Sequence, residues 1–292
     1  NCYSILSINT ILVTLNIWKA VNQLREMGYE IDSVPNKGYC IRSAPDLLNK
    51  NELESIRKTT WIGSSLECFD VIGSTNTTAM QMAEDGAPHG TLVVADRQDS
   101  GKGRRGRTWI VPAGIAIAMS IVLKPEGLLP GHAPQLTLVT ALAVARAIEQ
   151  QTGLSVQIKW PNDIVIDGKK VCGILTEMST QIDYINHIVV GIGINVHNEQ
   201  FPEELIDRAT SLYLASGGRH YSRAALVEAV CEQFEYFYGI FMRTQDMSGL
   251  KEVYDDCLVN RGRTVRILDP KGEYEGVALG ITPQGDGGYR VY

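Results

Sequence analysis

The sequence predicts an α+β protein of three parts, because three different patterns follow one another along its 292 residues. A helical pattern and then an alternating hairpin pattern come first. Apolar strand-like runs that alternate with helical patterns fill the middle, and short strands between Pro, Gly and Asp turns close the chain. We expect the corresponding domains at 1–62, 63–245 and 246–292.

The first part predicts one helix and one hairpin. In "IWKAVNQLREMGYEI", the residues Ile17, Val21 and Leu24 recur at helical spacing, and Gly28 marks the end of the helix. "YEIDSVPNKGYCI" alternates around a Pro-Asn-Lys-Gly turn, which is typical of a two-stranded hairpin. A helix followed by such a hairpin favours the second half of a winged helix-turn-helix, and a small helical cap is the alternative.

The middle part predicts a mixed sheet with helices, and the last part a small β-barrel. The expected strands of the middle part are 91–95, 116–123, 156–160 and 187–194. Its expected helices are 75–85, 136–151 and 222–238. The barrel is predicted from the short strand-like segments "TVRILDP", "YEGVALGIT" and "GGYRVY".

Composition excludes several classes of protein. A net charge of −6 argues against a protein that is basic all over, such as a non-specific nucleic-acid coat. Six scattered cysteines with no C-x-x-C pair are typical of reduced thiols in the cytoplasm. No apolar run approaches the ~18–20 residues of a membrane span, so no membrane partner is expected. The apolar "ILSINTILVTL" lacks a preceding basic region and is not predicted to be a signal peptide.

One short stretch concentrates positive charge in this acidic chain. "SGKGRRGRTW" (100–109) interleaves its basic residues with glycines, and it lacks the Ser or Thr of a Walker A loop. Glycines let backbone N–H groups turn towards an anion, and arginine offers paired donors to oxyanions. The flanking strand-like "TLVVAD" and "TWIVP" favour an ordered anion-binding loop over a disordered RNA-binding tail.

A second polar stretch, "KWPND" (159–163), follows a predicted strand. Its Asn and Asp can bind a hydrated Mg²⁺, and its lysine can bind phosphate. A polar strand-ending turn is the alternative interpretation. Lys170 in "DGKKVCGILTE" would on its own be taken as a solvated lysine.

Five motifs in order resemble the biotin–protein ligases: "GSTN" (73–76), "RQDSGKGRRGRTW" (97–109), "KWPNDI" (159–164), "GKKVCGILTE" (168–177) and "GIGINV" (191–196). The N-terminal helix and "VPNKGY" resemble the bifunctional members that also repress the biotin operon. The resemblance implies that the middle part is a biotinyl-ligase domain. It implies an enzyme that joins biotin and ATP to biotinyl-5′-AMP with Mg²⁺, and then modifies a lysine of the biotin carboxyl carrier protein of acetyl-CoA carboxylase.

The resemblance also implies roles for individual residues. Biotin binding is expected from Ser74, Thr75, Asn76, Gln98, Lys102, Gly103, Arg104, Lys170 and Gly173. ATP and adenylate binding are expected from Arg105, Arg107, Trp109, Asn162 and Asn195. The expected catalytic residues are Lys170, Arg104, Lys159 and Asp163, and Asp163 is also expected to contact Mg²⁺ through water.

Three segments depart from the pattern of the family. Lys102 stands where arginine is common, "VPAGIAIAMS" (111–120) lacks a usual serine and a glycine, and "TILVTLN" (10–16) replaces the start of a recognition helix.

The resemblance also implies partners. Operator DNA is expected to meet Lys19, Arg25 and Lys37, on a homodimer that biotinyl-5′-AMP promotes. Two alternatives stay open: a related lipoate-type ligase, and a ligand-sensing DNA-binding regulator without ligase activity.

Overall fold

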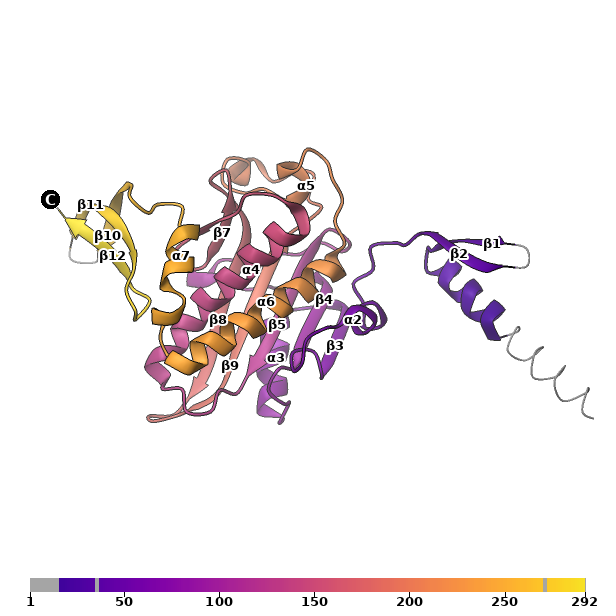
Figure 1. The fold of residues 1–292 in the computed structure, drawn as a ribbon, viewed down its shortest axis with the longest axis horizontal. Helices are drawn as coiled ribbons and strands as arrows, with labels where there is room; N and C mark the ends of the chain where they lie inside the picture. Colours follow the sequence, from indigo (N-terminus) through magenta and orange to yellow (C-terminus); the bar gives the residue numbers. More distant parts are fainter. Residues whose placement is uncertain (1–15, 35–36, 270–271, 292) are drawn as a thin grey trace, which may run out of the picture. The chain divides into compact units, whose positions relative to one another are not determined.

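The computed structural model describes residues 16–34, 37–269 and 272–291 (Figure 1). The chain divides after Asp46 into two units, Asn1–Asp46 and Leu47–Tyr292, and each is described by itself. The domain boundaries at 62 and 245 remain predictions. Residues 10–15 of "TILVTLN" and Asn36 at the hairpin tip lie outside the described residues.

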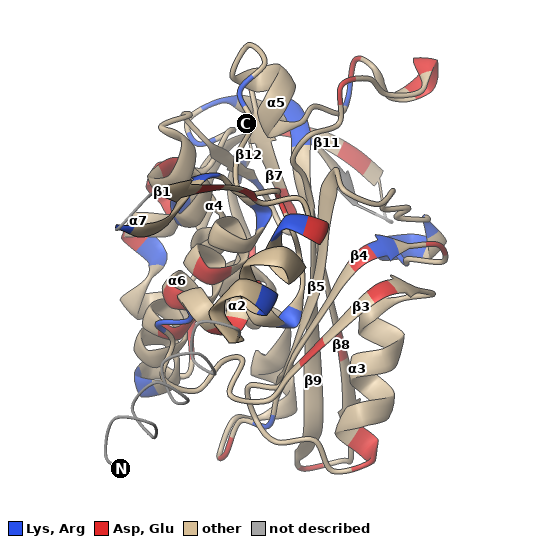
Figure 2. Ribbon diagram, turned by 90° about the vertical axis from the view of Figure 1, so that its right-hand side faces the viewer, with Lys and Arg blue, Asp and Glu red and all other residues tan. Residues whose placement is uncertain are grey.

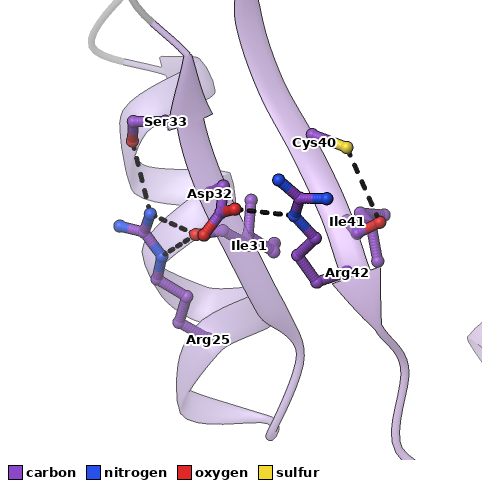
Figure 3. A network of polar contacts seen from close by, with 7 residues as sticks. All are labelled: Arg25, Ile31, Asp32, Ser33, Cys40, Ile41 and Arg42. Carbon is purple, nitrogen blue, oxygen red and sulfur yellow. Dashed lines mark hydrogen bonds and ion pairs between the residues drawn. The ribbon is translucent and has the colours of Figure 1, made fainter.

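The N-terminal unit has a helix over 16–26 and a hairpin of β1 (Glu30–Val34) and β2 (Gly38–Ser43). Gly28 has a φ of +96°, a conformation that favours glycine and ends the helix where the sequence predicts. Arg25 joins the helix to β1, since its Nη2 donates to the Ile31 carbonyl at 2.6 Å and to Ser33 Oγ at 3.3 Å (Figure 3). Arg42 Nε pairs with Asp32 across the hairpin at 2.7 Å.

The second unit contains a seven-stranded sheet of order β3-β4-β5-β9-β8-β7-β6. β3 and β4 are parallel and the remaining neighbours are antiparallel, so the predicted mixed sheet is confirmed. The strands are β3 (Leu66–Ile72), β4 (Leu92–Gln98), β5 (Ala116–Leu123), β6 (Gln157–Lys159), β7 (Asp163–Ile166), β8 (Lys169–Thr180) and β9 (Ile185–Asn195).

Helices cover the two faces of this sheet unequally (Figure 1). α4 (Leu136–Thr152) and α6 (Arg223–Thr244) pack over the main core on one face. On the other face, the short α3 (Thr75–Glu84) packs its alanines against one buried valine from each of β4, β5 and β9. The short α3 covers only part of this second face. Every second side chain of the strands points to this face, so those beyond α3 can form a site.

The remaining helices are short. The α-helices are α2 (Lys50–Ile56), α5 (Leu212–Ala215) and α7 (Lys251–Cys257). The 3₁₀ helices are η1 (Arg104–Gly106), η2 (Pro130–Gln135), η3 (Glu203–Leu205) and η4 (Met247–Gly249). In the described part of the chain, no helix has both the length and the apolar character that crossing a membrane requires.

The C-terminal strands β10 (Thr264–Asp269), β11 (Gly272–Ile281) and β12 (Gly287–Val291) form an antiparallel three-stranded sheet. The part predicted as a small β-barrel is therefore, over the described residues, a three-stranded sheet of order β10-β11-β12. Asp255 of α7 accepts a hydrogen bond from the Ile281 amide at 2.8 Å, so helix and sheet are joined inside the protein.

Two carboxylates of α6 bind the backbone of the segment that leads into β3. Glu228 Oε1 accepts from the amides of Lys58 and Thr59 at 2.5 and 3.2 Å. Glu235 accepts from the amides of residues 60, 61 and 62 at 2.9, 2.7 and 2.8 Å. Burial raises the pKa of Glu228, whereas at Glu235 the amide hydrogen bonds outweigh partial burial and lower the pKa.

Glu235→Gln is expected to lower the free energy of unfolding by about 2 kcal/mol at pH 7, because hydrogen bonds to a charged acceptor are lost. A lowered pKa in the folded protein means that this stabilisation is present above the unfolded pKa and is lost as the pH falls through the folded one. Urea unfolding from pH 7 downward should therefore show the difference from the parent shrinking below pH about 4.3.

Glu232→Gln is the matched control, since Glu232 lies on the same helix and its ion pair with Lys58 spans 3.8 Å at the surface. A Glu235→Gln variant as stable as this control at pH 7 would contradict the assignment.

Candidate functional site

Small residues of three adjacent strands form the floor of the site. The register aligns Ala118 of β5 with Gly193 of β9 and Gly173 of β8, and the next row contains Ser120 and Gly191. A Cβ on Gly191 would lie 2.0 Å from Asn76 Oδ1, and one on Gly193 would lie 2.2 Å from Trp109 Nε1. Glycine is therefore required at both positions for α3 and Trp109 to approach the sheet.

The N-terminus of α3 supplies a buried polar end to the site. Ser120 Oγ lies 2.8 Å from Thr75 Oγ1 and 2.7 Å from Asn76 Oδ1. Asn76 Nδ2 donates to Glu177 Oε2 at 2.8 Å, and the Thr75 amide donates to Gln98 Oε1 at 2.9 Å. Because each side chain is held by others, this end offers fixed donors and acceptors to a small neutral polar group.

The basic loop that follows β4 is folded back on itself, and Figure 2 shows its Lys and Arg residues gathered beside β4. The Trp109 amide donates to the Gly101 carbonyl at 2.8 Å, and the Gly103 amide donates to the Arg107 carbonyl at 2.7 Å. Gln98 Nε2 donates to the Trp109 carbonyl at 3.1 Å. A Cβ on Gly101 would lie 1.9 Å from Gln98 Nε2. The loop therefore packs directly against Gln98 of the polar end.

Two cations face the site and are held by the turn of "KWPND". Lys170 Nζ lies 2.6 Å from Asp163 Oδ1 and 5.3 Å from the ring centre of Trp109. Arg104 Nη1 donates to Asn162 Oδ1 at 2.9 Å. Lys170 is therefore a positioned group rather than a freely solvated lysine, and positioned cations suit an anionic ligand.

Most of the predicted site residues line one pocket. These are Ser74, Thr75, Asn76, Gln98, Lys102, Gly103, Arg104, Trp109, Asn162, Lys170 and Gly173.

Five other predicted residues are not part of the lining of this pocket. Asp163 reaches it through Lys170, and Asn195 donates from Nδ2 to the Thr210 carbonyl at 3.1 Å. The remaining three, Lys159, Arg105 and Arg107, are exposed.

The residues predicted to meet DNA belong to the N-terminal unit. Lys19 and Lys37 are exposed, and the guanidinium of Arg25 donates hydrogen bonds to β1.

Sequence reasoning missed six lining residues, namely Ala118, Ile174, Leu175, Gly191, Ile192 and Gly193, together with the supporting Ser120 and Glu177. A signal for them exists. Small residues stand at every second position of "AIAMS" and of "GIGIN", which places them on one face of a strand.

The site offers no covalent nucleophile of the thiol type and no preformed metal centre. Burial raises the pKa of the nearby Cys172 thiol, which keeps it protonated. Within the residues that the structure describes, no group of three or more His, Cys, Asp or Glu side chains could hold a metal ion. The oriented polar side chains and the two positioned cations suit the site to positioning a ligand and to neutralising negative charge.

Comparisons with known proteins agree with this geometry. A sequence model of the "Biotin/lipoate A/B protein ligase family" matches residues 68–195. The "Bifunctional ligase/repressor BirA" of Bacillus subtilis is 40% identical over 92% of this chain and 82% of its own length. The protein of the same name from Escherichia coli is 27% identical over 91% of this chain and 81% of its own.

A solved structure supports the same relationship. The Aquifex aeolicus biotin protein ligase "in complex with biotin and ATP" matches with a TM-score of 0.67 and 31% identity, over 78% of this chain and 95% of that one. The similarity in sequence and the similarity in fold therefore point to the same family. The chain belongs to the biotin/lipoate protein ligase family and, within it, to the bifunctional ligase/repressors of the BirA type.

Proposed function

We propose that the protein is a biotin–protein ligase that forms biotinyl-5′-AMP from biotin and ATP. The biotinyl group is then transferred to a lysine of the biotin carboxyl carrier protein of acetyl-CoA carboxylase. One observation carries the proposal: a fixed neutral polar end and two positioned cations lie in one pocket, over a floor of small residues. Biotin has a neutral ureido head and a carboxylate, and this pocket complements both.

The proposed binding mode follows from the geometry. The ureido head meets Ser74, Thr75 and Asn76 at the N-terminus of α3, where the side chains are already oriented. The carboxylate end lies towards Lys102–Arg104 and Lys170, because the cations gather there. The polar end favours biotin over lipoate, whose dithiolane ring offers no comparable hydrogen-bonding groups.

The proposed reaction needs no nucleophile from the protein. A carboxylate oxygen of biotin attacks the α-phosphorus of ATP, and the bond to the leaving pyrophosphate breaks with its electron pair. The unprotonated amine of the carrier-protein lysine then attacks the acyl carbon, AMP leaves with the electron pair of the broken acyl–oxygen bond, and the nitrogen gives up a proton to solvent. In the first step two anions must approach, so Lys170 and Arg104 contribute by lowering their repulsion and by stabilising the charge on the phosphate oxygens.

Magnesium would enter as the counter-ion of ATP, where it supplies further neutralisation of the phosphates. The residues fit this mode, because Mg²⁺ commonly keeps waters and uses one carboxylate together with substrate phosphates. Asp163 is the carboxylate next to Lys170 at the pocket. Because its Oδ1 is already paired with Lys170, we expect Asp163 to contact Mg²⁺ through a water molecule.

Adenylate formation is the direct test. The protein is incubated with ATP, Mg²⁺ and either biotin or lipoate, and the acyl-adenylate is sought by mass spectrometry. Biotinyl-AMP is expected with biotin and no lipoyl-AMP with lipoate. Lipoyl-AMP alone would support the lipoate-type ligase, and no adenylate with either acid would support a ligand-sensing regulator.

The same proposal includes repression of a biotin operon from the cytoplasm. The N-terminal unit carries a helix and a hairpin, and its four basic residues are balanced by four acidic ones. A unit without net charge gains little from long-range attraction to DNA. Useful affinity therefore requires two chains on one two-fold operator, in a homodimer that biotinyl-5′-AMP promotes.

Operator binding is expected to strengthen when biotin and ATP are added and to weaken steeply with salt. Lys37→Ala should weaken binding and reduce the slope of log affinity against log salt by about one per chain. A gel-shift titration on a biotin-operon promoter measures both effects, with Lys58→Ala as the control outside the helix and hairpin. Binding that is independent of biotin and ATP would contradict the coupling.

A further inference from the structure

A buried ion pair outside the pocket joins α6 to β4. Arg223 is the first residue of α6 and is 2% exposed. Its Nη1 donates to Asp96 Oδ1 at 2.6 Å and to the Ala116 carbonyl at 3.3 Å. Neither Arg223 nor Asp96 lines the pocket described above.

The pair binds both sides of one turn. The Gly114 amide donates to Asp96 Oδ1 and Oδ2 at 3.3 and 3.1 Å, and Ala116 begins β5. Gly114 has a φ of +78°, so the chain reverses there. The pair thus fixes the turn at Gly114 and the first residue of β5, on the segment that follows Trp109.

Stability alone is a poor reason for this arrangement. Removing a guanidinium from water is costly, and well-packed apolar residues often replace a buried ion pair without loss of stability. A cation at the N-terminus of a 22-residue helix also opposes the helix dipole. What the pair provides is a defined geometry for the two backbone groups that it holds.

That geometry matters for the nucleotide side of the site. Ala116 is paired with Asn195 across β5 and β9, and Trp109 stands over Gly193 of the same strand. Asn195 and Trp109 are two of the five residues that are expected to bind the nucleotide. The polar end for biotin is held by Ser120, Glu177 and Gln98, and it meets this side through the hydrogen bond from Gln98 Nε2 to the Trp109 carbonyl.

We propose that Arg223 and Asp96 are positioning residues for the nucleotide: they hold the turn at Gly114 so that Trp109 and Asn195 keep the spacing that ATP requires. The inference rests on the proposed ligase function. It predicts a larger effect on ATP than on biotin, because the pair is hydrogen-bonded directly to Gly114 and Ala116, and none of these hydrogen bonds goes to a residue of the polar end.

The test compares Arg223→Met and Asp96→Asn with the parent in steady-state pyrophosphate release and in biotin titration. The KM for ATP should rise about tenfold, which corresponds to about 1.4 kcal/mol. The affinity for biotin should stay within about twofold. Asp96→Asn retains an acceptor for the Gly114 amide, so it tests the proposal if Arg223→Met fails to fold. Arg223→Lys should restore part of the ATP affinity.

Arg146→Met is the control for loss of an arginine ion pair that does not touch the Gly114 turn, because Arg146 pairs with Glu149 within α4 at 2.8 Å and is partly exposed. Equal changes for ATP and biotin, or a lower active fraction with both constants unchanged, would overturn the proposal and leave a structural role only. Failure of the proposed function is recognised separately, because then the parent protein itself forms no adenylate.

Discussion

Lys170→Ala is expected to slow the formation of biotinyl-5′-AMP by about 100-fold or more, the scale for removal of one preorganised charged donor at a reacting centre. The ammonium lies at 2.6 Å from Asp163 and faces the pocket, so it is in place before the substrates meet. Its loss leaves the carboxylate of biotin and the α-phosphate to repel each other. Rapid-mix measurement of adenylate formation isolates this step from transfer to the carrier protein.

The matched control is Lys169→Ala. Lys169 is the neighbouring residue, and its Nζ donates to the Ile206 carbonyl at 3.0 Å, at the surface. This control should form the adenylate at the parental rate. If Lys170→Ala also did so, the ion pair of Lys170 with Asp163 would be structural only and the charge-neutralising role would be wrong.

Gly191→Ala is expected to weaken biotin binding by about 100-fold, which is about 2.7 kcal/mol. The added Cβ would lie 2.0 Å from Asn76 Oδ1 and 3.0 Å from its Nδ2. Asn76 cannot move aside without losing its contacts with Ser120 and Glu177. One methyl group therefore disorders the polar end that receives the ureido head.

Calorimetric titration with biotin measures this effect, and thermal unfolding checks that the variant is folded. Gly239→Ala serves as control, because a Cβ at Gly239 meets no atom within 4 Å. A folded Gly191→Ala protein that binds biotin within about threefold of the parent would show that Asn76 does not fix the biotin head.

The local elements could be predicted because their signals are local. Gly28 ends the first helix since its positive φ disfavours other residues. The apolar run from 116 to 123 predicts a strand by itself, and β5 has these bounds. The basic loop could also be identified from the sequence. It gathers four cationic residues among three glycines in a chain of net charge −6, and binding of an anion explains this concentration of positive charge.

The partners of the site residues could not be predicted in this way. Periodicity assigns Ala118, Ser120, Gly191 and Gly193 to faces of their strands, but it says nothing of which strands are neighbours. β5, β9 and β8 are adjacent although β6 and β7 intervene in the sequence. The same limit hid Glu177, whose contact with Asn76 joins residues far apart in the chain.

The sequence by itself determined the α+β class, the family and most of the residues that line the pocket, because glycines, charges and apolar periods act over a few residues. Only the tertiary structure decided how these residues are used. It pairs Lys170 with Asp163, makes two glycines of β9 indispensable, and connects the Gly114 turn to Arg223. The physical reason is that strand order and register, set by burial of the whole sheet, bring together side chains that no local pattern relates.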